Sequence, residues 1–306
     1  MSAVTADDEH PRAGDDPAFR DAITFSFGDP VAQVYGLARV AVGGGGASGF
    51  AVVFAGDAVA GASTEAQVAL ETPERWDDVR AAGVHCTVEA PLESWTVDYA
   101  GADAAFELRF EALSAPAVFD PDGRVAQAGG LEGYEQLCGV SGSVRHGGRS
   151  HSVRCLGQRG HQWGTPDWSR IELARTLSAW MGTDRAVTLT AVRPAKAKHH
   201  DAEAVGGFLI DRDAPLEIFD PRLSTTYDGD LRQRRAGLEL WMGEEGGYAR
   251  RAAGSAVCGT TIDLGELRLD SSFFSWTMEG RVGTGRYDVL RRVSGNGGGV
   301  LRRRQR

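Results

Sequence analysis

Short runs of alternating apolar and polar residues, separated by turn residues, recur along almost the whole chain and restrict what it can fold into. The clearest pair is residues 94–99 (SWTVDY) and 106–112 (FELRFEA), which flank a short turn. In the second run, Phe106, Leu108 and Phe110 share one face of an extended strand, and charged residues share the other. A strand with one apolar and one charged face is typical of an antiparallel sheet with one side in contact with water.

Turn residues divide these runs at short intervals. The 41 glycines among 306 residues favour turns and bulges over long helices. Residues 34–42 lead through the glycines at 43–46 into another strand, and Gly56 with Asp57 can form the next hairpin turn. A further hairpin is predicted around residues 182–184. This rhythm predicts an all-β protein, either a barrel or a large antiparallel β-sandwich.

Two segments interrupt the strand rhythm. Residues 116–130 are rich in proline, glycine and aspartate, which is typical of a connection between domains. Residues 167–181 have apolar residues at helical spacing, yet the hairpin that follows needs a partner strand before it. We predict a short helical turn at 167–173 and then a strand, although the spacing alone leaves helix and strand open.

Charge and hydropathy exclude several classes of protein. The net charge of −9 argues against a nucleic-acid partner, because contacts to phosphate need clustered positive charge. No run approaches the roughly 20 apolar residues of a membrane span, and the N-terminal residues contain no apolar stretch of signal-peptide length. We therefore expect a cytoplasmic protein without an integral membrane segment. Four separated cysteines, Cys86, Cys138, Cys155 and Cys258, are expected to be free, buried thiols.

Familiar cofactor and metal motifs do not occur in the sequence. It lacks a phosphate-binding loop, a HExxH zinc motif and the strand and helix alternation of a dinucleotide-binding fold. Histidines occur at His85, at His146 and His151, and at His199 and His200, without the carboxylate or cysteine spacing of a zinc site. We therefore expect neither a cofactor nor a bound metal.

Residues 151–163 (HSVRCLGQRGHQW) form the predicted strand that is richest in chemically active side chains. When this strand is extended, Val153 and Trp163 share one face, which is the better candidate for the interior. Arg159 and His161 lie on the same face and are predicted to point inward. Buried polar groups are costly without partners, so such residues bind one another or meet a ligand.

Asp167 follows the turn after this strand and is the nearest potential partner for either side chain. In one interpretation the cluster is structural, and Asp167 pairs with Arg159. Trp163 and Trp168 then close one end of a barrel. In the other interpretation the cluster lines a partly polar, aromatic pocket for an apolar molecule. A carboxyl group in such a pocket has a raised pKa, so Asp167 could donate a proton while His161 orients it.

The run from Tyr134 to Trp168 resembles the middle of the carotenoid 1,2-hydratase (hydroxyneurosporene synthase) and AttH-like family of lipocalin-type two-barrel proteins. The family motif has the form G-x-R-D-H-S-W-G-x-R-D-W, and its matches here are Gly157, Arg159, His161, Trp163, Gly164, Asp167 and Trp168. Residues 280–292 also resemble the glycine-rich last strand of that family. The resemblance implies two consecutive lipocalin-like antiparallel β-barrels around an apolar cavity. It also implies relatives that hydrate isoprenoid double bonds or form rings in natural products.

This sequence departs from the family motif at three positions. Gly160 stands where the family commonly has aspartate, Gln162 replaces serine, and Pro166 replaces arginine. The change at Gly160 removes a candidate general acid, so the fold is implied more strongly than the inherited chemistry.

The residues and the resemblance together predict the domain organisation. The predicted segments are a disordered N-terminus at 1–19, a first barrel at 20–118, a linker at 119–129, a second barrel with the motif at 130–293, and a basic flexible tail at 294–306.

The expected partner is a hydrophobic small molecule such as an isoprenoid, a polyketide or a fatty-acyl compound. We expect acid–base hydration, isomerisation or cyclisation, with Asp167 as the acid and His161 and Arg159 orienting it or the substrate. The expected lining residues are aromatic: Trp163, Trp168, Trp180 and Tyr134. The alternatives are a lipocalin-like carrier without chemistry and a carbohydrate-binding sandwich. The sequence leaves the oligomeric state open.

Overall fold

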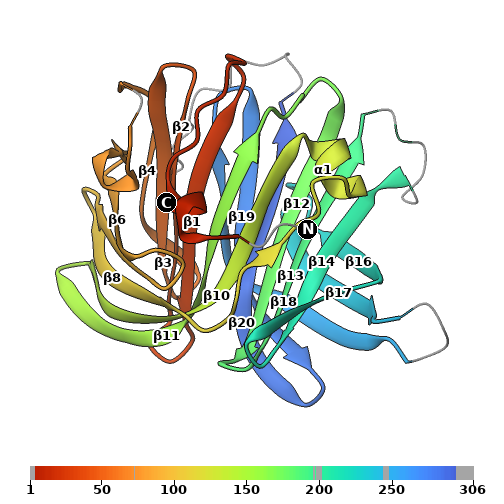
Figure 1. Cartoon of the computed structure of the whole chain (residues 1–306). Coiled ribbons are helices and arrows are strands. Elements are labelled where there is room, and N and C mark those ends of the chain that lie inside the picture. Colours follow the sequence, from red (N-terminus) through yellow and green to blue (C-terminus); the bar gives the residue numbers. More distant parts are fainter. Residues whose placement is uncertain (1–3, 72, 196, 198–201, 244–247, 294–306) are drawn as a thin grey trace.

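The computed structural model describes residues 4–71, 73–195, 197, 202–243 and 248–293, and it consists almost entirely of antiparallel strands. Two strongly curved sheets lie side by side, one built from the earlier part of the chain and one from the later part (Figure 1). They form two consecutive lipocalin-like β-barrels. The predicted fold class is therefore confirmed, and the chain does not form one large sandwich.

The first sheet follows the strand order β4-β3-β2-β1-β11-β10-β8-β7-β6-β5, and the short β9 pairs with β10. Its strands are β1 (Arg20–Asp29), β2 (Val34–Gly43), β3 (Gly46–Ala55), β4 (Ala58–Ala69), β5 (Arg80–Ala81), β6 (Val84–Ala90), β7 (Ser94–Ala100), β8 (Ala104–Ala112), β9 (Ala117–Val118), β10 (Leu131–His146) and β11 (Arg149–Gly164). The helical elements of this part are η1 (Ala6–Glu9), η2 (Trp76–Asp78) and α1 (Arg124–Gly129).

The second sheet follows the order β15-β14-β13-β12-β20-β19-β18-β17-β16. Its strands are β12 (Ile171–Gly182), β13 (Arg185–Pro194), β14 (Ala204–Asp211), β15 (Ala214–Glu217), β16 (Asp220–Tyr227), β17 (Gln233–Trp241), β18 (Arg250–Asp263), β19 (Leu267–Met278) and β20 (Arg281–Arg292). Neighbouring strands are joined mainly by short turns, as the glycine-rich turn segments predict.

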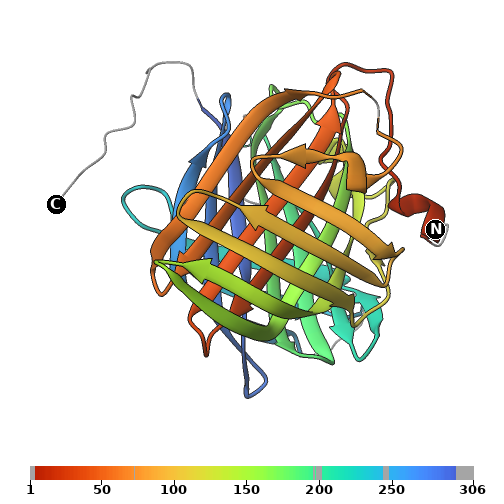
Figure 2. The same ribbon diagram turned by 90° about the vertical axis from the view of Figure 1, so that its left-hand side faces the viewer.

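In each sheet the first strand pairs with the last one. β1 pairs along its length with β11, and β12 pairs with β20. The far ends of the first sheet also meet, because Ser63 Oγ of β4 donates to Ala82 O and Ala82 N donates to Glu65 Oε2. Figure 2 shows the first barrel from the side, with its strands crossing one another around the interior. The meander therefore curls into a barrel in each half of the chain.

Apolar side chains fill both barrels because residues alternate across each strand. In β1, Ile23, Phe25 and Phe27 point into the first barrel, where they are almost completely buried. Phe106 and Phe110 of β8 join the same cluster, as the alternation of that run predicts. The second barrel has its own core, which is built around Phe274, Trp276, Tyr287, Leu177 and Leu238.

A third apolar cluster joins the outer faces of the two sheets. It includes Tyr35, Leu37 and Phe54 from the first sheet, and Trp180 and Phe273 from the second. Strands at this junction are therefore buried on both faces, so their sequences read as continuous apolar runs rather than as alternating ones.

The predicted division of the chain is wrong in two respects. The two sheets separate between Gly164 and Ile171 rather than at residues 119–129, because β10 and β11 pair with β8 and β1 of the first sheet. In the predicted disordered N-terminus, residues 4–19 are described: they contain η1 and bury Glu9. The predicted tail at 294–306 lies outside the described residues.

The ambiguous segment at 167–181 is a turn followed by a strand. Arg170 N donates to Asp167 O in the turn, and β12 begins directly afterwards at Ile171. The four cysteines are free, and Cys86, Cys138 and Cys258 are buried as expected, whereas Cys155 is only partly buried. Within the described ranges, no helix has the length and apolar character needed to cross a membrane.

Candidate functional site

The side chains of β11 follow the predicted strand phase. Val153, Arg159 and His161 all point into the first barrel, and Arg159 and His161 are fully buried. The two polar residues are thus brought together inside one barrel. Their partners come from distant parts of the chain rather than from the turn that follows β11.

His161 lies between a carboxylate and a phenol. His161 Nε2 is 2.7 Å from Asp21 Oδ1 of β1, and His161 Nδ1 is 3.2 Å from the Tyr134 hydroxyl of β10. Burial lowers the pKa of His161 and outweighs the opposing effect of Asp21, so the imidazole is held in its neutral form. Burial raises the pKa of Tyr134 to about 12.

Arg159 pairs with Glu9 of the N-terminal segment. Arg159 Nη2 lies 2.5 Å from Glu9 Oε1, and both side chains are shielded from water. The guanidinium lies over the rings of Trp95 and Tyr134 at 5.1 and 4.7 Å from their centroids. The mainly apolar interior of the first barrel therefore contains a packed polar cluster, whose geometry supports a structural role for Arg159 and His161.

Asp167 does not join this cluster, and it is not the partner of Arg159 or His161 that the sequence suggests. Its side chain is exposed, and Oδ1 accepts hydrogen bonds from Ser169 N and Ser169 Oγ. The bond from the Ser169 hydroxyl lowers the pKa of Asp167, and the backbone bond adds to this effect. A surface carboxylate that is held in its ionised form is poorly suited to donate a proton.

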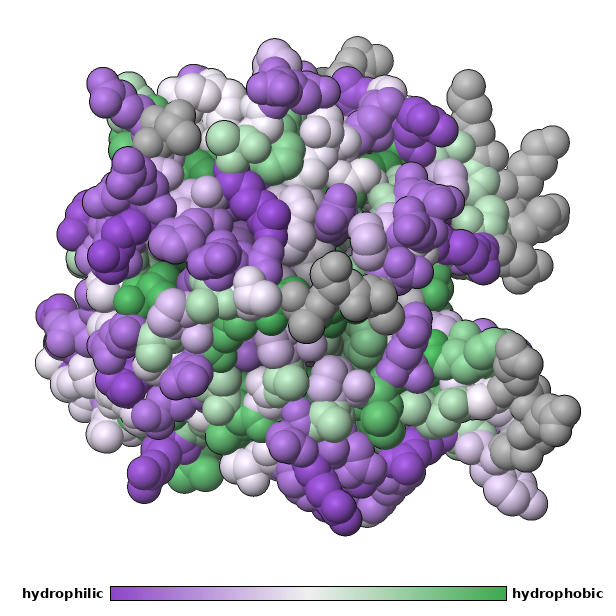
Figure 3. Space-filling model, viewed as in Figure 1, coloured by the Kyte–Doolittle hydropathy of each residue, from purple (hydrophilic) through white to green (hydrophobic). Residues whose placement is uncertain are grey.

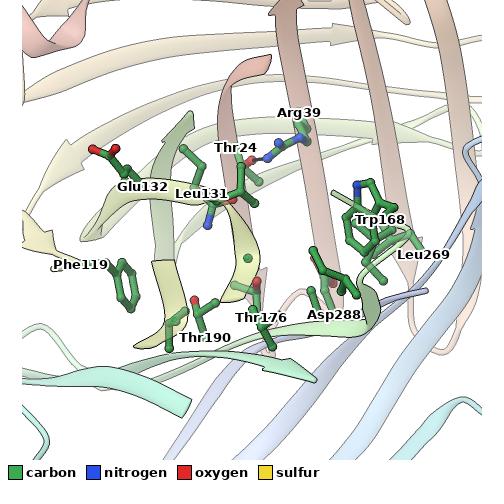
Figure 4. A pocket seen from close by; sticks show the side chains of 18 of the residues that line it. Thr24, Arg39, Phe119, Leu131, Glu132, Trp168, Thr176, Thr190, Leu269 and Asp288 are labelled. Carbon is green, nitrogen blue, oxygen red and sulfur yellow. Dashed lines mark hydrogen bonds between the residues drawn. The ribbon is translucent and has the colours of Figure 1, made fainter. Parts of the chain in front are cut away.

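An apolar pocket of about 180 Å³ lies instead between the two sheets. Thr24 and Arg39 of the first sheet face Thr176 and Asp288 of the second, and Phe119 lies at one end (Figure 4). The remaining lining is largely apolar, including Phe50, Val125, Leu131, Trp168, Ile171, Val192, Leu264, Leu269 and Leu290. An apolar pocket with a few convergent polar groups is the usual form of a small-molecule site.

Outside this pocket, polar groups cover most of the face seen in Figure 3, where purple side chains predominate. Apolar residues, in green, reach the surface in a band across the middle of that face. The molecule thus presents apolar groups to its surroundings as well as in its interior.

Two arginines and two carboxylates line the pocket: Arg39, Arg286, the largely buried Asp288 and the exposed Glu132. Arg39 Nη1 donates to Thr24 Oγ1 at 2.8 Å, and Arg286 Nε lies 3.3 Å from Asp288 Oδ2. Burial, together with the positive charge of Arg286, lowers the pKa of Arg39 to about 10, so that Arg39 still carries its charge at neutral pH. Within the described part of the chain, Arg286 Nε and Asp288 Oδ1 have no hydrogen-bond partner. Burial raises the pKa of Asp288.

A buried carboxylate that sequence reasoning missed lies beside this pocket. Glu135 occupies the same face of β10 as Leu131 and Gly133, which line the pocket, and is only 3% exposed. Its Oε2 accepts a hydrogen bond from Gln158 Nε2 at 2.5 Å. Burial raises the pKa of Glu135 against the opposing charge of Arg286, so this acid retains a proton more readily than a surface glutamate.

The strand register brings the polar groups of the first sheet into one row. Arg39, Thr24, Gly160 and Glu135 lie directly opposite one another on the successive strands β2, β1, β11 and β10. The signal for Glu135 in the sequence is weak, since a lone glutamate in a strand usually faces water. The strand pairing of β10 with β11 reveals its place.

The predicted aromatic residues separate into different environments. Trp168 lines the pocket between the sheets. Trp163 lies at the end of the first barrel, where the Arg12 guanidinium is 3.8 Å from its ring centroid. Tyr134 lies inside that barrel. Trp180 is buried between the sheets, and its Nε1 donates to Gln158 Oε1 at 3.1 Å.

The histidines do not assemble a metal site in the described part of the chain. No group of three or more histidine, cysteine or acidic side chains has a suitable arrangement there. His146 and His151 stack with their ring centroids 4.6 Å apart. His199 and His200 lie outside the described residues.

The family model for the domain of unknown function DUF7064 matches residues 4–293. The chain belongs to the DUF7064 family. This match spans both barrels and the N-terminal segment that carries Glu9. No protein among the curated ones is detectably similar in sequence to this DUF7064 member.

Solved structures share the two-barrel fold with this DUF7064 protein. An AttH-like protein from Nitrosomonas europaea is 10% identical, with a TM-score of 0.65 over 90% of this chain and 93% of that one. Kievitone hydratase from Nectria haematococca is 11% identical, with a TM-score of 0.64 over 89% and 88%. CghA solved with Sch210972 is 11% identical, with a TM-score of 0.62 over 91% and 89%. The resemblance to the AttH-like lipocalin-type fold is thereby confirmed.

Proposed function

We propose that this protein binds an apolar small molecule with an acidic or carbonyl oxygen in the pocket between its sheets, and transforms it by proton transfer. The observation that carries this proposal is the set of charged groups in an otherwise apolar pocket. Arg39 and Arg286 line the pocket, and Arg39 keeps its charge with a pKa of about 10, whereas burial raises the pKa values of Asp288 in the pocket and of Glu135 beside it. The arginines can hold an oxyanion, and a protonated carboxyl group can supply the proton.

The class of substrate follows from the lining. Aromatic and aliphatic side chains favour an isoprenoid, polyketide or fatty-acyl skeleton, and two guanidinium groups favour an oxygen that gains negative charge during reaction. The cavity of about 180 Å³ exceeds the roughly 150 Å³ that admits benzene in an engineered protein interior. Acid-catalysed hydration, isomerisation and cyclisation each begin with proton transfer from such an acid. One neighbour with this fold is by name a hydratase.

The proposed assignment of roles differs from the one that the motif suggests. Glu135 is the proposed proton donor, and Arg39 with Arg286 are the proposed oxyanion ligands. Asp288 is the alternative donor because it lines the same pocket and burial raises its pKa against the opposing charge of Arg286. Trp168 is proposed as an apolar wall of the site, while Arg159 and His161 support the barrel from its interior.

Native mass spectrometry of the protein isolated from its own host tests the binding step. We expect a co-purified apolar compound that is retained by Arg154→Gln, a control on an exposed arginine of β11. Arg286→Gln should lower the bound fraction about 10- to 100-fold, because a charge-assisted hydrogen bond is lost. Equal retention by Arg286→Gln, Arg39→Gln and the control would contradict the proposed site.

A turnover assay with the identified compound then separates an enzyme from a carrier. We expect Glu135→Gln to bind the compound and to convert it at least about 100-fold more slowly, since a positioned proton donor contributes about this much. If the wild-type protein returns the compound unchanged, the molecule is a non-catalytic carrier of apolar ligands, which is the second candidate function.

A further inference from the structure

The N-terminal segment is attached to the first barrel by a charged residue. Within residues 4–19, Glu9 is the buried side chain, with 3% of its surface exposed, and most of its neighbours are exposed. Buried segments usually anchor themselves with apolar residues, because burial of a carboxylate is costly unless it is paired. A buried carboxylate that attaches the segment therefore indicates a receiving site on the barrel whose donors suit a carboxylate.

Three donors from separate elements converge on the Glu9 carboxylate. Oε1 accepts hydrogen bonds from Trp95 Nε1 at 2.9 Å and from Arg159 Nη2 at 2.5 Å. Oε2 accepts one from Leu92 N at 3.1 Å. These donors belong to β7, to β11 and to the turn between β6 and β7. Both oxygens of the acid are thus recognised, one of them by a charged group.

Contacts with other residues of the first barrel fix the positions of these donors. The Arg159 guanidinium lies over the rings of Trp95 and Tyr134, at 5.1 and 4.7 Å from their centroids. Leu92 has a φ of 62°, a conformation that is unfavourable for a leucine. Its carbonyl oxygen accepts a hydrogen bond from Gln136 Nε2 at 3.0 Å, which fixes the turn on its inner side. The receiving site is therefore pre-formed by residues other than those of the N-terminal segment.

The other attachments of the segment are also polar. Arg12 N donates to Asp21 Oδ2 at 2.6 Å, and the Arg12 guanidinium covers Trp163. His10 Nδ1 lies 3.2 Å from Glu74 O. A segment held mainly by polar contacts at a barrel end can exchange with a soluble group of the same chemistry, because little apolar surface has to be re-exposed.

We propose that Arg159, Trp95 and Leu92 form a binding site for the carboxylate of a small organic acid, which the chain's own Glu9 occupies as an internal ligand. When the segment is withdrawn, an external carboxylate replaces Glu9 and neutralises Arg159. This site lies inside the first barrel, on the opposite face of the sheet from the pocket between the barrels. It is therefore independent of the proposed function and of any compound bound there.

Chemical rescue of Glu9→Ala by sodium formate tests the proposal, with sodium chloride at equal ionic strength as the reference. Removal of Glu9 leaves a buried, unpaired arginine, so we expect the thermal midpoint to fall by roughly 5 to 15 °C. Formate should restore at least half of this loss in a saturable manner. Asp7→Ala, which removes an exposed acid of the same short helix, should show no specific response to formate. Equal midpoints of Glu9→Ala in formate and in chloride would overturn the proposal.

The rescue must also depend on Arg159. In Glu9→Ala/Arg159→Met, formate should have no more effect than chloride, and a preserved formate response would place the binding elsewhere. If Glu9→Ala does not fold without a carboxylate, the readout is the yield of folded protein after dilution from denaturant. We then expect a higher yield in formate than in chloride, and equal yields contradict the site.

Hydrogen exchange on the wild-type protein provides a measurement without any variant. At molar formate we expect amides of residues 4–12 to exchange severalfold faster than in chloride, while those of β11 remain unchanged. A segment whose exchange does not respond to formate is not displaceable, and the internal ligand would then be a permanent part of the barrel.

Discussion

The Glu135 carboxylate lies over Gly160 of the neighbouring strand, and a Cβ atom at position 160 would be 2.7 Å from Glu135 Oε2. The two residues are directly opposite each other in the pairing of β10 with β11. The motif that this chain resembles commonly carries an aspartate at the position of Gly160. The structure supplies a carboxylate to the same place from the adjacent strand, and the absence of a side chain at Gly160 makes room for it.

A carboxylate introduced at position 160 should therefore conflict with Glu135. We expect Gly160→Asp to lower the free energy of unfolding by about 1 to 3 kcal/mol through overpacking, with further loss from repulsion between like charges. Gly160→Asp/Glu135→Ala should recover most of this loss, because the acid has then moved from one strand to the other. Denaturant unfolding of the two single variants and the double variant measures the coupling.

Gly229→Asp is the matched control for the same substitution. Nothing lies within 4 Å of a Cβ atom at Gly229, so this variant should unfold close to the wild-type midpoint. If Gly160→Asp is as stable as Gly229→Asp, the space above Gly160 is not occupied by Glu135.

Trp168 and Trp163 should differ in their effect on ligand binding although both belong to the same motif. Trp168 lines the pocket between the sheets, whereas Trp163 packs under Arg12 at the end of the first barrel. We expect Trp168→Ala to weaken binding of the co-purified compound about 10-fold or more, since burial of an aromatic side chain contributes 1.5 to 3 kcal/mol. Trp163→Ala should leave the dissociation constant within a factor of about 2. Titration of each variant with the compound provides the comparison, and a reversed order would remove Trp168 from the site.

Asp167 should be dispensable in spite of its place in the motif. Its carboxylate is exposed and binds the neighbouring Ser169, so Asp167→Asn should change the thermal midpoint by less than about 2 °C. Ligand turnover should remain at the wild-type rate, measured beside Glu135→Gln in the same assay. A large loss of turnover in Asp167→Asn alone would restore it as the acid.

The buried imidazole of His161 should make stability depend on pH in acid. Burial lowers the pKa of His161 in the folded protein below its value of about 6.5 in the unfolded chain. As the pH falls below 6.5, the unfolded chain binds a proton that the folded protein excludes, so stability decreases by up to about 1.4 kcal/mol per pH unit. The loss continues until the pH reaches the folded-state pKa.

Urea unfolding between pH 7.5 and 5 measures this slope. His161→Gln should reduce it, whereas His10→Gln, which changes an exposed histidine, should retain it. A wild-type slope that is unchanged in His161→Gln would mean that another group controls the acid loss.

The local alternation of apolar and polar residues predicts the individual strands well. The assignment of strands to sheets fails where it depends on pairing between distant parts of the chain. Hairpins such as β7 with β8 are visible because their apolar and charged residues alternate within a few positions. The assignment of residues 131–164 to the second barrel fails because the partners of β11 lie in β1, more than a hundred positions away. The segment at 116–130, which is rich in proline, glycine and aspartate, contains β9 and the short helix α1. It does not separate the two sheets, because the strands on both sides of it belong to the first one.

The candidate site is harder to predict for a related reason. Strand phase places Arg159 and His161 in the interior, but their partners Glu9 and Asp21 are separated from them by 150 and 140 residues. The pocket itself is made by the outer faces of two sheets. Its lining residues read as ordinary strand positions until both sheets are seen together.

The pairing of the first strand with the last in each barrel has a consequence for synthesis of the chain. β1 exposes one of its edges until residues 149–164 have left the ribosome. β12 likewise has an unpaired edge until residues 281–292 have been synthesised. Such long loops must close before the sheet gains its central ladder, which slows folding and leaves strand edges available for wrong partners. A nascent chain of this kind therefore depends on protection during translation more than its finished, closed barrels suggest.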